Sequence, residues 1–429
     1  MNRRKFIHKS LAASSMIMLP KIGYQKQSQK SHRITHLTQP VAIAMWDFSW
    51  LLRHHRIGSF EDWDKVLDGL AERGYNAIRI DCFPHLVASD SDGNITEEFF
   101  HPMSEWGKPI LWGNQYSMYS RPREALLEFL PKCRERGIHV GLATWFLGHG
   151  TDRNKTVIGL DGFIRVWDET LELLNNHNLL SDILYVDLLN EYPLWHGFDW
   201  LTDELNRMTD KKKFQNTNSD AHIPDINFIK SDGKKYNPAQ EAFYKSFMTD
   251  AIKQLKIRWL NIDFFASLSH ASNVPWVEND FSQFSCLDAH IWFSHNNDFS
   301  TATNYHSTIH APKNDLAFEK ANKDIKAYWQ QHEGEMISWM DQELKLRAEI
   351  SKKYNIVCGN TEGWGTIMWY EHPALDWEFM KTSGDVCVDL SIKHCFKFIC
   401  TSNFTHPHFP GIWDDIKWHR QVTNRIKQA

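Results

Sequence analysis

The sequence contains few cysteines, and none is arranged in a recognisable motif. Only seven of the 429 residues are cysteine, and no two of them form a CxxC pair or stand at the spacing of zinc ligands. Cys82, Cys286, Cys358 and Cys400 lie in strand-like apolar runs, where a thiol behaves as a small buried hydrophobe. We therefore expect mostly free buried thiols, at most one disulfide, no structural metal and no cofactor.

The chain also lacks an excess of positive charge and any break in composition. Its formal net charge is -5 at pH 7 and its pI is about 6.5, so the basic footprint of a nucleic-acid-binding protein is missing. No low-complexity linker divides the chain. These observations argue against nucleic acid as a partner and predict a single domain over residues 38–429.

Long hydrophobic runs are missing too, and the apolar stretch near the N-terminus, "SLAASSMIMLP", is too short to span a bilayer. It follows the basic residues Arg3, Arg4 and Lys5, as in an export signal. The paired arginines before Phe6 and Ile7 look like a twin-arginine signal. We expect residues 1–30 to be a signal and leader, the protein to be exported to the periplasm or beyond, and no lipid anchor, because no cysteine follows the run.

Aromatic residues, in contrast, are abundant. They make up 13% of the chain, and 19 of them are tryptophan. Most of these rings are expected to pack in a large core. So many indoles in one domain also favour a cleft in which sugar rings stack on aromatic side chains.

Strand-like and helix-like segments alternate from residue 41 to the C-terminus. The apolar strand runs are nearly continuous, which is typical of parallel strands covered on both faces. About eight strand–helix units in one domain predict a single (β/α)₈ TIM barrel with long βα loops. The expected strands are 41–48, 76–82, 138–146, 183–190, 258–267, 286–293, 356–363 and 395–404. The expected helices are 59–74 (opened by Ser59, with Asp62 completing a capping box), 120–137, 161–178, 238–256, 318–354, 373–392 and a last one from Trp413.

In such a barrel, catalytic groups lie at the carboxyl ends of the strands. The fourth strand ends in Asn190 and Glu191, and the seventh ends in Glu362. These two strands stand on opposite sides of an eight-strand ring, so both carboxylates can meet across its mouth. Two facing carboxylates are what cleavage of a glycosidic bond requires. Other polar or aromatic strand ends are Asp47, Arg79, Asp81, Trp145, His290, Trp292 and Asn403.

The segments "LLNEYP", "GNTEGWG" and "RGYNAIRIDCFPH" resemble the acid/base, nucleophile and second strands of clan A glycoside hydrolases. The nearest group is the cellulase-like set related to glycoside hydrolase family 5. The resemblance covers the chain in architecture from about Val41, but its motifs cover only three or four strand ends. The chain departs from the group in the sixth strand, where "AHIWF" replaces a His-Tyr pair.

The resemblance implies a retaining β-glycoside hydrolase acting on oligo- or polysaccharides. Glu191 would be the acid/base and Glu362 the nucleophile. Arg79 would keep Glu362 ionised, and Asn190 would bond the sugar 2-hydroxyl. His290 could support either glutamate, and Asp47 and Asp81 could bind sugar hydroxyls. The candidate sugar platforms are Trp46, Trp145, Trp292, Trp364 and Trp413.

Two other interpretations stay open. A carbohydrate-binding barrel could retain the cleft without catalysis. A metal-dependent hydrolase is suggested by 23 histidines, including His406 and His408, but the first strand offers no histidine pair to complete a metal site. The polar insertion 210–238 could form a cleft wall or a solvated loop. The sequence reveals neither the sugar specificity nor the oligomeric state.

Overall fold

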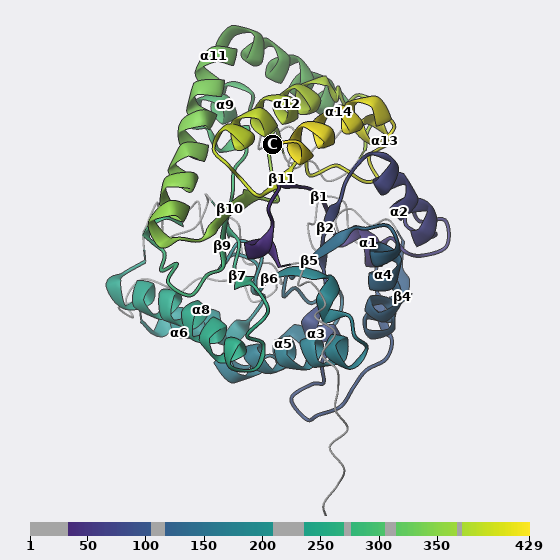
Figure 1. The fold of residues 1–429 in the computed structure, drawn as a ribbon, viewed down its shortest axis with the longest axis vertical. Helices are drawn as coiled ribbons and strands as arrows, with labels where there is room; N and C mark the ends of the chain where they lie inside the picture. The colour runs from purple at the N-terminus through teal and green to yellow at the C-terminus, as the bar shows by residue number, and fades with distance from the viewer. Residues whose placement is uncertain (1–32, 104–115, 209–235, 270–275, 305–314, 367–370) are drawn as a thin grey trace, which may run out of the picture. The chain divides into compact units, whose positions relative to one another are not determined.

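A computed structural model describes residues 33–103, 116–208, 236–269, 276–304, 315–366 and 371–429. These residues belong to one unit, Ser31–Ala429. At its centre lies a ring of parallel strands, with helices around it (Figure 1). The predicted (β/α)₈ barrel is confirmed.

The ring has eight strand positions, one of which consists of two short pieces. The sheet order is β7-β6-β5-β2-β1-β11-β10-β9-β8, and every pair in it is parallel. The end strands β7 and β8 are separated by two residues, so this one segment pairs with β6 on one side and β9 on the other and closes the ring. The bounds are β1 Val41–Asp47, β2 Ala77–Asp81, β5 His139–Ala143, β6 Ile183–Asp187, β7 Phe264–Phe265, β8 Leu268–Ser269, β9 Cys286–His290, β10 Val357–Asn360 and β11 Phe398–Cys400. An antiparallel hairpin, β3 Phe99–His101 and β4 Met118–Ser120, lies between β2 and the next long helix.

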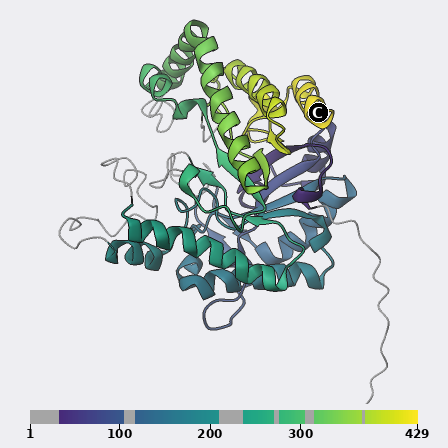
Figure 2. The same cartoon turned by 60° about the vertical axis from the view of Figure 1, so that its left-hand side comes forward.

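The longer helices follow the strands as expected. They are α2 Trp63–Glu72, α4 Pro122–Glu135, α5 Gly159–Asn176, α8 Pro238–Arg258, α11 Asp315–Tyr354, α12 Glu378–Lys393 and α14 Ile416–Lys427. Shorter ones are α1 Ser49–Leu52, α3 Pro84–Val87, α6 Asp199–Arg207, α9 Asn297–Ala302 and α13 Pro410–Trp413. Figure 2 shows α11 beside α12, as Figure 1 does.

Several expected boundaries were wrong, among them the start of α12, which is Glu378 and not residue 373, and that of the last helix, which is Ile416 because Trp413 ends the short α13. Helix α2 begins after Asp62, whose side chain accepts a hydrogen bond from the Lys65 amide at 3.0 Å, so Asp62 is the N-cap and Ser59 is not. Helix α8 runs to Arg258, and the expected strand 258–267 starts only at Phe264. Residues 259–262, three of which are apolar, look strand-like in composition, but they form part of the connection between the two elements.

The barrel interior changes from aromatic to charged along the strand direction. Tyr185 packs against Phe265 and Phe398, with ring centroids 5.1 and 5.9 Å away. A Cβ on Gly141 would lie 2.2 Å from the Tyr185 ring, so only glycine leaves room for this packing. Since side chains alternate along a strand, Asp187, two residues after Tyr185, also faces the interior. This alternation places the charged layer directly below the barrel mouth.

Several expectations concern other properties of the chain. All seven cysteines are free, and only Cys395 among them is exposed. In the described part of the chain, no helix combines the length and apolarity needed to cross a membrane. The proposed export signal, residues 1–30, lies outside the described residues, as does nearly all of the insertion 210–238.

Candidate active site

Glu191 lies just beyond β6, where the chain turns with a left-handed φ of 49°. Its amide donates to Ser267 Oγ at 2.9 Å. Its Oε1 is 3.1 Å from His290 Nδ1, and its Oε2 accepts a hydrogen bond from the Trp195 indole at 2.7 Å. The side chain keeps 13% of its surface exposed. Glu191 is therefore held at two points while one part of it remains accessible.

Glu362 follows β10 and is almost completely buried. Its Oε1 is 2.6 Å from Arg79 Nη1, and its amide donates to Asn360 Oδ1 at 3.0 Å. Asn403 Nδ2 approaches its Oε2 at 3.5 Å. Burial raises the pKa of Glu362 to about 7, against the opposing effects of the His290 and Arg79 cations. The carboxyl group is thus poised to change its charge near neutral pH.

Arg79, in the middle of β2, is the central cation of the charged layer. It is fully buried, and Asp47, Asp187 and Glu362 surround it at 3.7, 3.6 and 2.6 Å. It also donates to Asn190 Oδ1. Burial alone would lower the pKa of Arg79, but these carboxylates raise it well above its usual value. Arg79 therefore stays charged and connects the candidate nucleophile with Asn190.

His290, the last residue of β9, lies between the two glutamates. Its Nδ1 is 3.1 Å from Glu191 Oε1 and 3.6 Å from Glu362 Oε1. Burial by itself lowers the pKa of His290, but the negative charges of Glu362 and Asp288 outweigh it and raise the pKa to about 10. The acidic groups around His290 thus favour its protonated form.

One carboxylate oxygen from each glutamate and one His290 nitrogen lie within 4.8 Å of one another. The strands that carry Glu191 and Glu362 stand apart in the ring, so only its closure explains this convergence. The structure thus brings together four of the predicted residues, Glu191, Glu362, Arg79 and His290.

Asn190 joins this group with an unused donor. Its Oδ1 accepts hydrogen bonds from Arg79 and, at 3.3 Å, from Ser267 Oγ. Its Nδ2 is buried and has no hydrogen-bond partner among the described residues. A buried amide donor without a partner costs free energy, which a ligand acceptor would recover.

Asp47 and Asp81 hold neighbouring strand ends together through Trp145. Asp47 accepts from the Trp145 indole at 3.0 Å, and Asp81 accepts from the Trp145 and Phe83 amides at 3.0 and 2.8 Å. Burial raises the pKa values of both carboxyl groups, that of Asp81 strongly. Since both Asp81 oxygens are occupied by backbone donors, its contacts indicate a structural role and do not support the predicted hydroxyl binding.

The structure places the tryptophans predicted as sugar platforms in different surroundings. Trp145, itself only 3% exposed, packs against Trp195 beside the Glu191 side chain, with ring centroids 4.7 Å apart and ring planes tilted by 38°. Trp292 and Trp364 are each only 1% exposed, and the Trp364 indole donates to the Cys400 carbonyl. These two rings present no open face, so their contacts do not support the platform role expected of them.

Two further predicted platforms pack into the protein. The Trp46 indole donates to the Thr405 carbonyl and is buried. Trp413 lies against α2, with the Arg73 guanidinium 3.8 Å above its ring. Both contacts are those of core residues.

Sequence reasoning missed several polar residues of the site. Asp187 and Asp288 lie within apolar strand runs, and Thr361 accepts from Arg79 Nη1 at 3.0 Å. Ser267 contacts Asn190 and Glu191, and Trp195 contacts Glu191. The two-residue period was an available signal for Asp288, because it shares a strand face with His290, a residue already singled out.

The Glu191–His290–Glu362 group also has the spacing of a metal site. A metal ligand must be a neutral imidazole, whereas the pKa of His290 is raised to about 10. Arg79 already places a positive charge 2.6 Å from Glu362. The donor set therefore does not suit a cation. His406 belongs to no such cluster among the described residues, and its ring packs against Phe60 and Phe409.

Replacing Arg79 with Met is expected to destabilise the protein by about 3–5 kcal/mol, because it leaves buried carboxylates without the cation that compensates their charge. Burial already raises the pKa of Asp187 to about 6 and that of Glu362 to about 7, above the unfolded values of about 4. Stability contributed by such groups falls as the pH rises through this window. Without Arg79, the fall should be steeper, so urea unfolding should show a larger deficit at pH 8 than at pH 5.

The matched control is Arg121→Met, whose ion pairs with Glu98 and Glu124 are exposed and should contribute little to stability. Equal losses for the two variants would contradict a special role for Arg79.

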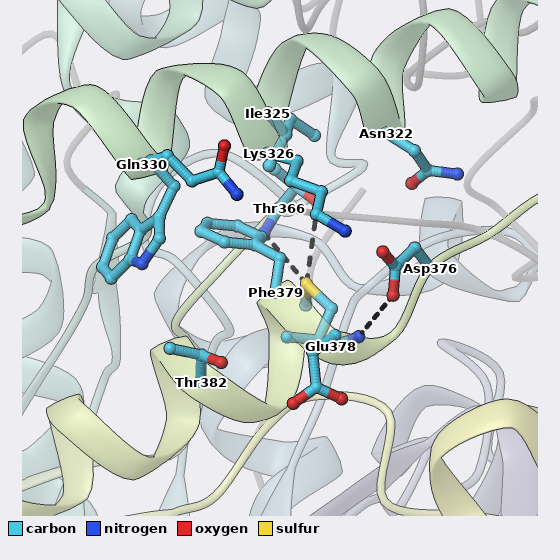
Figure 3. Close-up of a pocket in the computed structure, with 11 residues that line it drawn as sticks. Asn322, Ile325, Lys326, Gln330, Thr366, Asp376, Glu378, Phe379 and Thr382 are labelled. Carbon is cyan, nitrogen blue, oxygen red and sulfur yellow. Dashed lines mark hydrogen bonds between the residues drawn. The ribbon is translucent and has the colours of Figure 1, made fainter.

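A separate pocket of about 150 Å³ lies between α11 and α12 (Figure 3). Apolar Ile325, Trp329, Phe379 and Met380 line it together with polar residues such as Lys326 and Gln330. Thr366, four residues after Glu362, is the lining residue nearest in sequence to the site. None of the polar residues of the site described above lines this pocket, so it is distinct from the candidate active site.

Residues 43–427 match the family described as sugar-binding cellulase-like. This chain belongs to that family. The match spans the whole barrel, including all the strand ends discussed above. The predicted relationship to cellulase-like glycoside hydrolases is thereby confirmed. A comparison with curated proteins finds no match.

Solved structures resemble the cellulase-like chain to different degrees. A protein from Parabacteroides distasonis, described provisionally as a glycoside hydrolase, is 26% identical with a TM-score of 0.73, over 91% of this chain and 94% of that one. An endo-β-1,4-mannanase from Thermotoga petrophila is 12% identical with a TM-score of 0.46, over 92% and 78%. An endocellulase from Pyrococcus horikoshii is 13% identical with a TM-score of 0.45, over 90% and 92%. The last two are too distant to support an argument.

Proposed function

We propose that this cellulase-like protein is a retaining glycoside hydrolase that cleaves β-glycosidic bonds in oligo- or polysaccharides. The observation that carries the proposal is the approach of Glu191 and Glu362, whose oxygens lie within 4.8 Å of each other. Retaining enzymes hold their two carboxyl groups about 5–5.5 Å apart, whereas inverting enzymes leave about 6.5–9.5 Å for a water molecule. The short separation favours a covalent double displacement.

In the first step, Glu362 attacks the anomeric carbon and Glu191 transfers its proton to the departing glycosidic oxygen. The Arg79 cation, 2.6 Å from Glu362, opposes its protonation and fixes its orientation. Glu191 is the more exposed carboxyl group, as a residue that must meet the leaving group should be. In the second step, Glu191 accepts a proton from water, which then releases the sugar from Glu362.

Asn190 is suited to bind the 2-hydroxyl of the sugar at this centre. Its unpartnered Nδ2 offers a donor, and its Oδ1 is fixed by Arg79 and Ser267. A bond to the 2-hydroxyl strengthens as positive charge develops on the sugar ring, so it stabilises the transition state more than the ground state.

The experiment is the stereochemistry of the first product. Aryl β-glycosides of glucose, mannose and galactose are hydrolysed in an NMR tube, and the anomeric proton signals are followed from the earliest time points. We expect the β-anomer to form first and the α-anomer to appear only through mutarotation. Initial formation of the α-anomer would contradict the double displacement.

The family description favours a second candidate, a barrel that binds carbohydrate without cleaving it. This candidate predicts that the wild-type protein binds an oligosaccharide in calorimetry, releases no product from any aryl glycoside, and binds equally well as Glu191→Gln. Turnover by the wild-type protein excludes it. Export of the protein to the periplasm or beyond also remains our proposal, based on the N-terminal residues.

A further inference from the structure

We infer that His290 is a resident imidazolium with Asp288 as its counterion, and that Asp288 is a positioning residue for both glutamates. The charge state of His290 can be tested on its own. The effect of Asp288 on turnover rests on the proposed hydrolase function. Asp288 and His290 stand two residues apart on β9, face the barrel interior together and are each at most 1% exposed.

The hydrogen bonds of the Thr361 hydroxyl determine whether His290 Nε2 carries a proton. Thr361 Oγ1 lies 2.6 Å from Asp288 Oδ2, and the Thr361 amide donates to Asp288 Oδ1 at 3.1 Å. An ionised Asp288 can only accept, so the single hydroxyl proton of Thr361 points at it. Burial alone raises the pKa of Asp288, but the charge of His290 and its other partners lower it below its usual value, which agrees with an ionised group.

Because the Thr361 hydroxyl proton points at Asp288, Thr361 Oγ1 can only accept hydrogen bonds from its other neighbours. Arg79 Nη1 donates to it at 3.0 Å, and His290 Nε2 lies 3.3 Å away. His290 Nε2 must therefore carry a proton. Asp288 Oδ2, 3.7 Å from the same nitrogen, balances the resulting charge.

The other ring nitrogen, Nδ1, faces carboxylate oxygens. Glu362 Oε1, 3.6 Å away, accepts as the oxygen of the ionised nucleophile, and Glu191 Oε1, 3.1 Å away, accepts as well when Glu191 carries its catalytic proton on Oε2. Nδ1 therefore carries a proton as well. A ring protonated on both nitrogens is an imidazolium, in agreement with the raised pKa of His290.

All charged neighbours of the ring favour this state except one. Asp288 on the same strand, Glu362 after β10, Glu191 after β6 and Asp47 on β1 are acidic. Arg79 on β2 is the opposing cation, but its charge is surrounded by three carboxylates. Ser269, which pairs with His290 across the sheet, is neutral. Arg347 lies behind β9 and donates to the Ala289 carbonyl.

A fixed cation between the two glutamates has a consequence for the reaction. The charge of His290 lowers the pKa of Glu362, so it keeps more of the nucleophile ionised at a given pH. It also bonds to Glu191 while that residue loses its proton to the leaving group. Asp288 and Thr361 anchor the far side of the ring, so the position of Nδ1 between the glutamates depends on them.

The test is a pH titration of histidine-labelled protein by ¹H–¹⁵N NMR, with His290 assigned from the signal missing in His290→Gln. We expect wild-type His290 to show two protonated nitrogens from about pH 5 to 9, well above the ordinary histidine pKa of about 6.5. His85 is the internal control, because its burial lowers its pKa to about 3 and its ring stays neutral throughout. A neutral His290 ring at pH 8 would overturn the inference.

Variants test the part played by Asp288. Asp288→Asn should lower the midpoint of His290 by about one pH unit or more, since it removes an opposite charge. Its loss of kcat should grow with pH, with KM nearly unchanged, and Asp288→Glu should restore part of both. Thr361→Ser, which keeps the hydroxyl, should titrate as the wild type does. An unchanged His290 midpoint in Asp288→Asn, or a loss of kcat that is the same at every pH, contradicts the role of Asp288.

The NMR result does not require turnover. If the wild-type protein hydrolyses no glycoside while His290 still titrates as an imidazolium, the proposed function fails and the charge assignment stands. If the enzyme is active and His290 is neutral at pH 8, the assignment fails and the proposed function stands. Circular dichroism melting of each variant identifies those that have lost the fold. The His290 titration of Thr361→Ser is then compared with that of the wild type.

Discussion

Glu362→Gln is expected to lower kcat on aryl β-glycosides by on the order of 10⁵-fold, the scale of loss seen when an enzyme nucleophile is removed. The amide retains the shape of the carboxyl group, but it cannot form the covalent bond to the sugar. The variant should still fold, because the uncharged amide avoids the cost of a buried carboxylate. Initial rates with a dinitrophenyl glycoside measure the effect.

The same residue can be identified by chemical trapping. A 2-deoxy-2-fluoro β-glycoside with a good leaving group should form a stable adduct, and mass spectrometry of a digest should locate it on Glu362. Glu128→Gln is the matched control, because its carboxyl group is exposed on α4 and forms an ion pair of 3.9 Å with Lys132. An adduct on another residue, or full activity of Glu362→Gln, would remove Glu362 from the mechanism.

The convergence of the site could be predicted because it depends on topology. Glu191 and Glu362 end apolar strands, and any closed ring of eight parallel strands brings such ends to one mouth. Arg79 stood out for the same reason, as a charge inside an apolar run. The chain order of strands and loops was sufficient for this inference, without knowledge of any side-chain contact.

The importance of the residues that support the two glutamates could not be predicted from the chain order of strands and loops. Asp187 and Asp288 lie in mostly apolar strands, and their importance comes from the partners that the fold supplies, Arg79 for one and His290 and Thr361 for the other. Arg79 on β2 and Thr361 after β10 belong to other strands than the aspartates they contact, whereas His290 lies two residues from Asp288 on β9. Only the registers of the barrel, which the local pattern does not encode, place these groups within contact distance.

The roles of the tryptophans could not be predicted from the sequence either. An indole can serve as a sugar platform or as core packing, and the sequence around it is similar in both cases. Trp145, Trp292 and Trp364 follow strand ends and are all buried, whereas Trp195, four residues after Glu191, contacts that glutamate directly. The distinction depends on how the βα loops fold over the mouth.

The two glutamates should also differ in a way that assigns their roles. Glu191→Ala should reduce kcat/KM by about 10²–10⁴-fold for substrates with poor leaving groups, the usual contribution of a general acid. Dinitrophenolate needs no protonation to depart, so with this leaving group the first step should survive. The covalent intermediate should then accumulate, because no base remains to activate water.

Azide should rescue Glu191→Ala for that reason. As a small anion that needs no general base, it can enter the space left by the Glu191 side chain and attack the glycosyl–Glu362 intermediate. The product should be a β-glycosyl azide, since two displacements retain the configuration. Glu128→Gln should show neither dependence on the leaving group nor azide rescue. If Glu191→Ala gives an α-glycosyl azide, azide has replaced the nucleophile, and the roles of Glu191 and Glu362 must be exchanged. A loss of kcat/KM that is independent of the leaving group would show that Glu191 donates no proton.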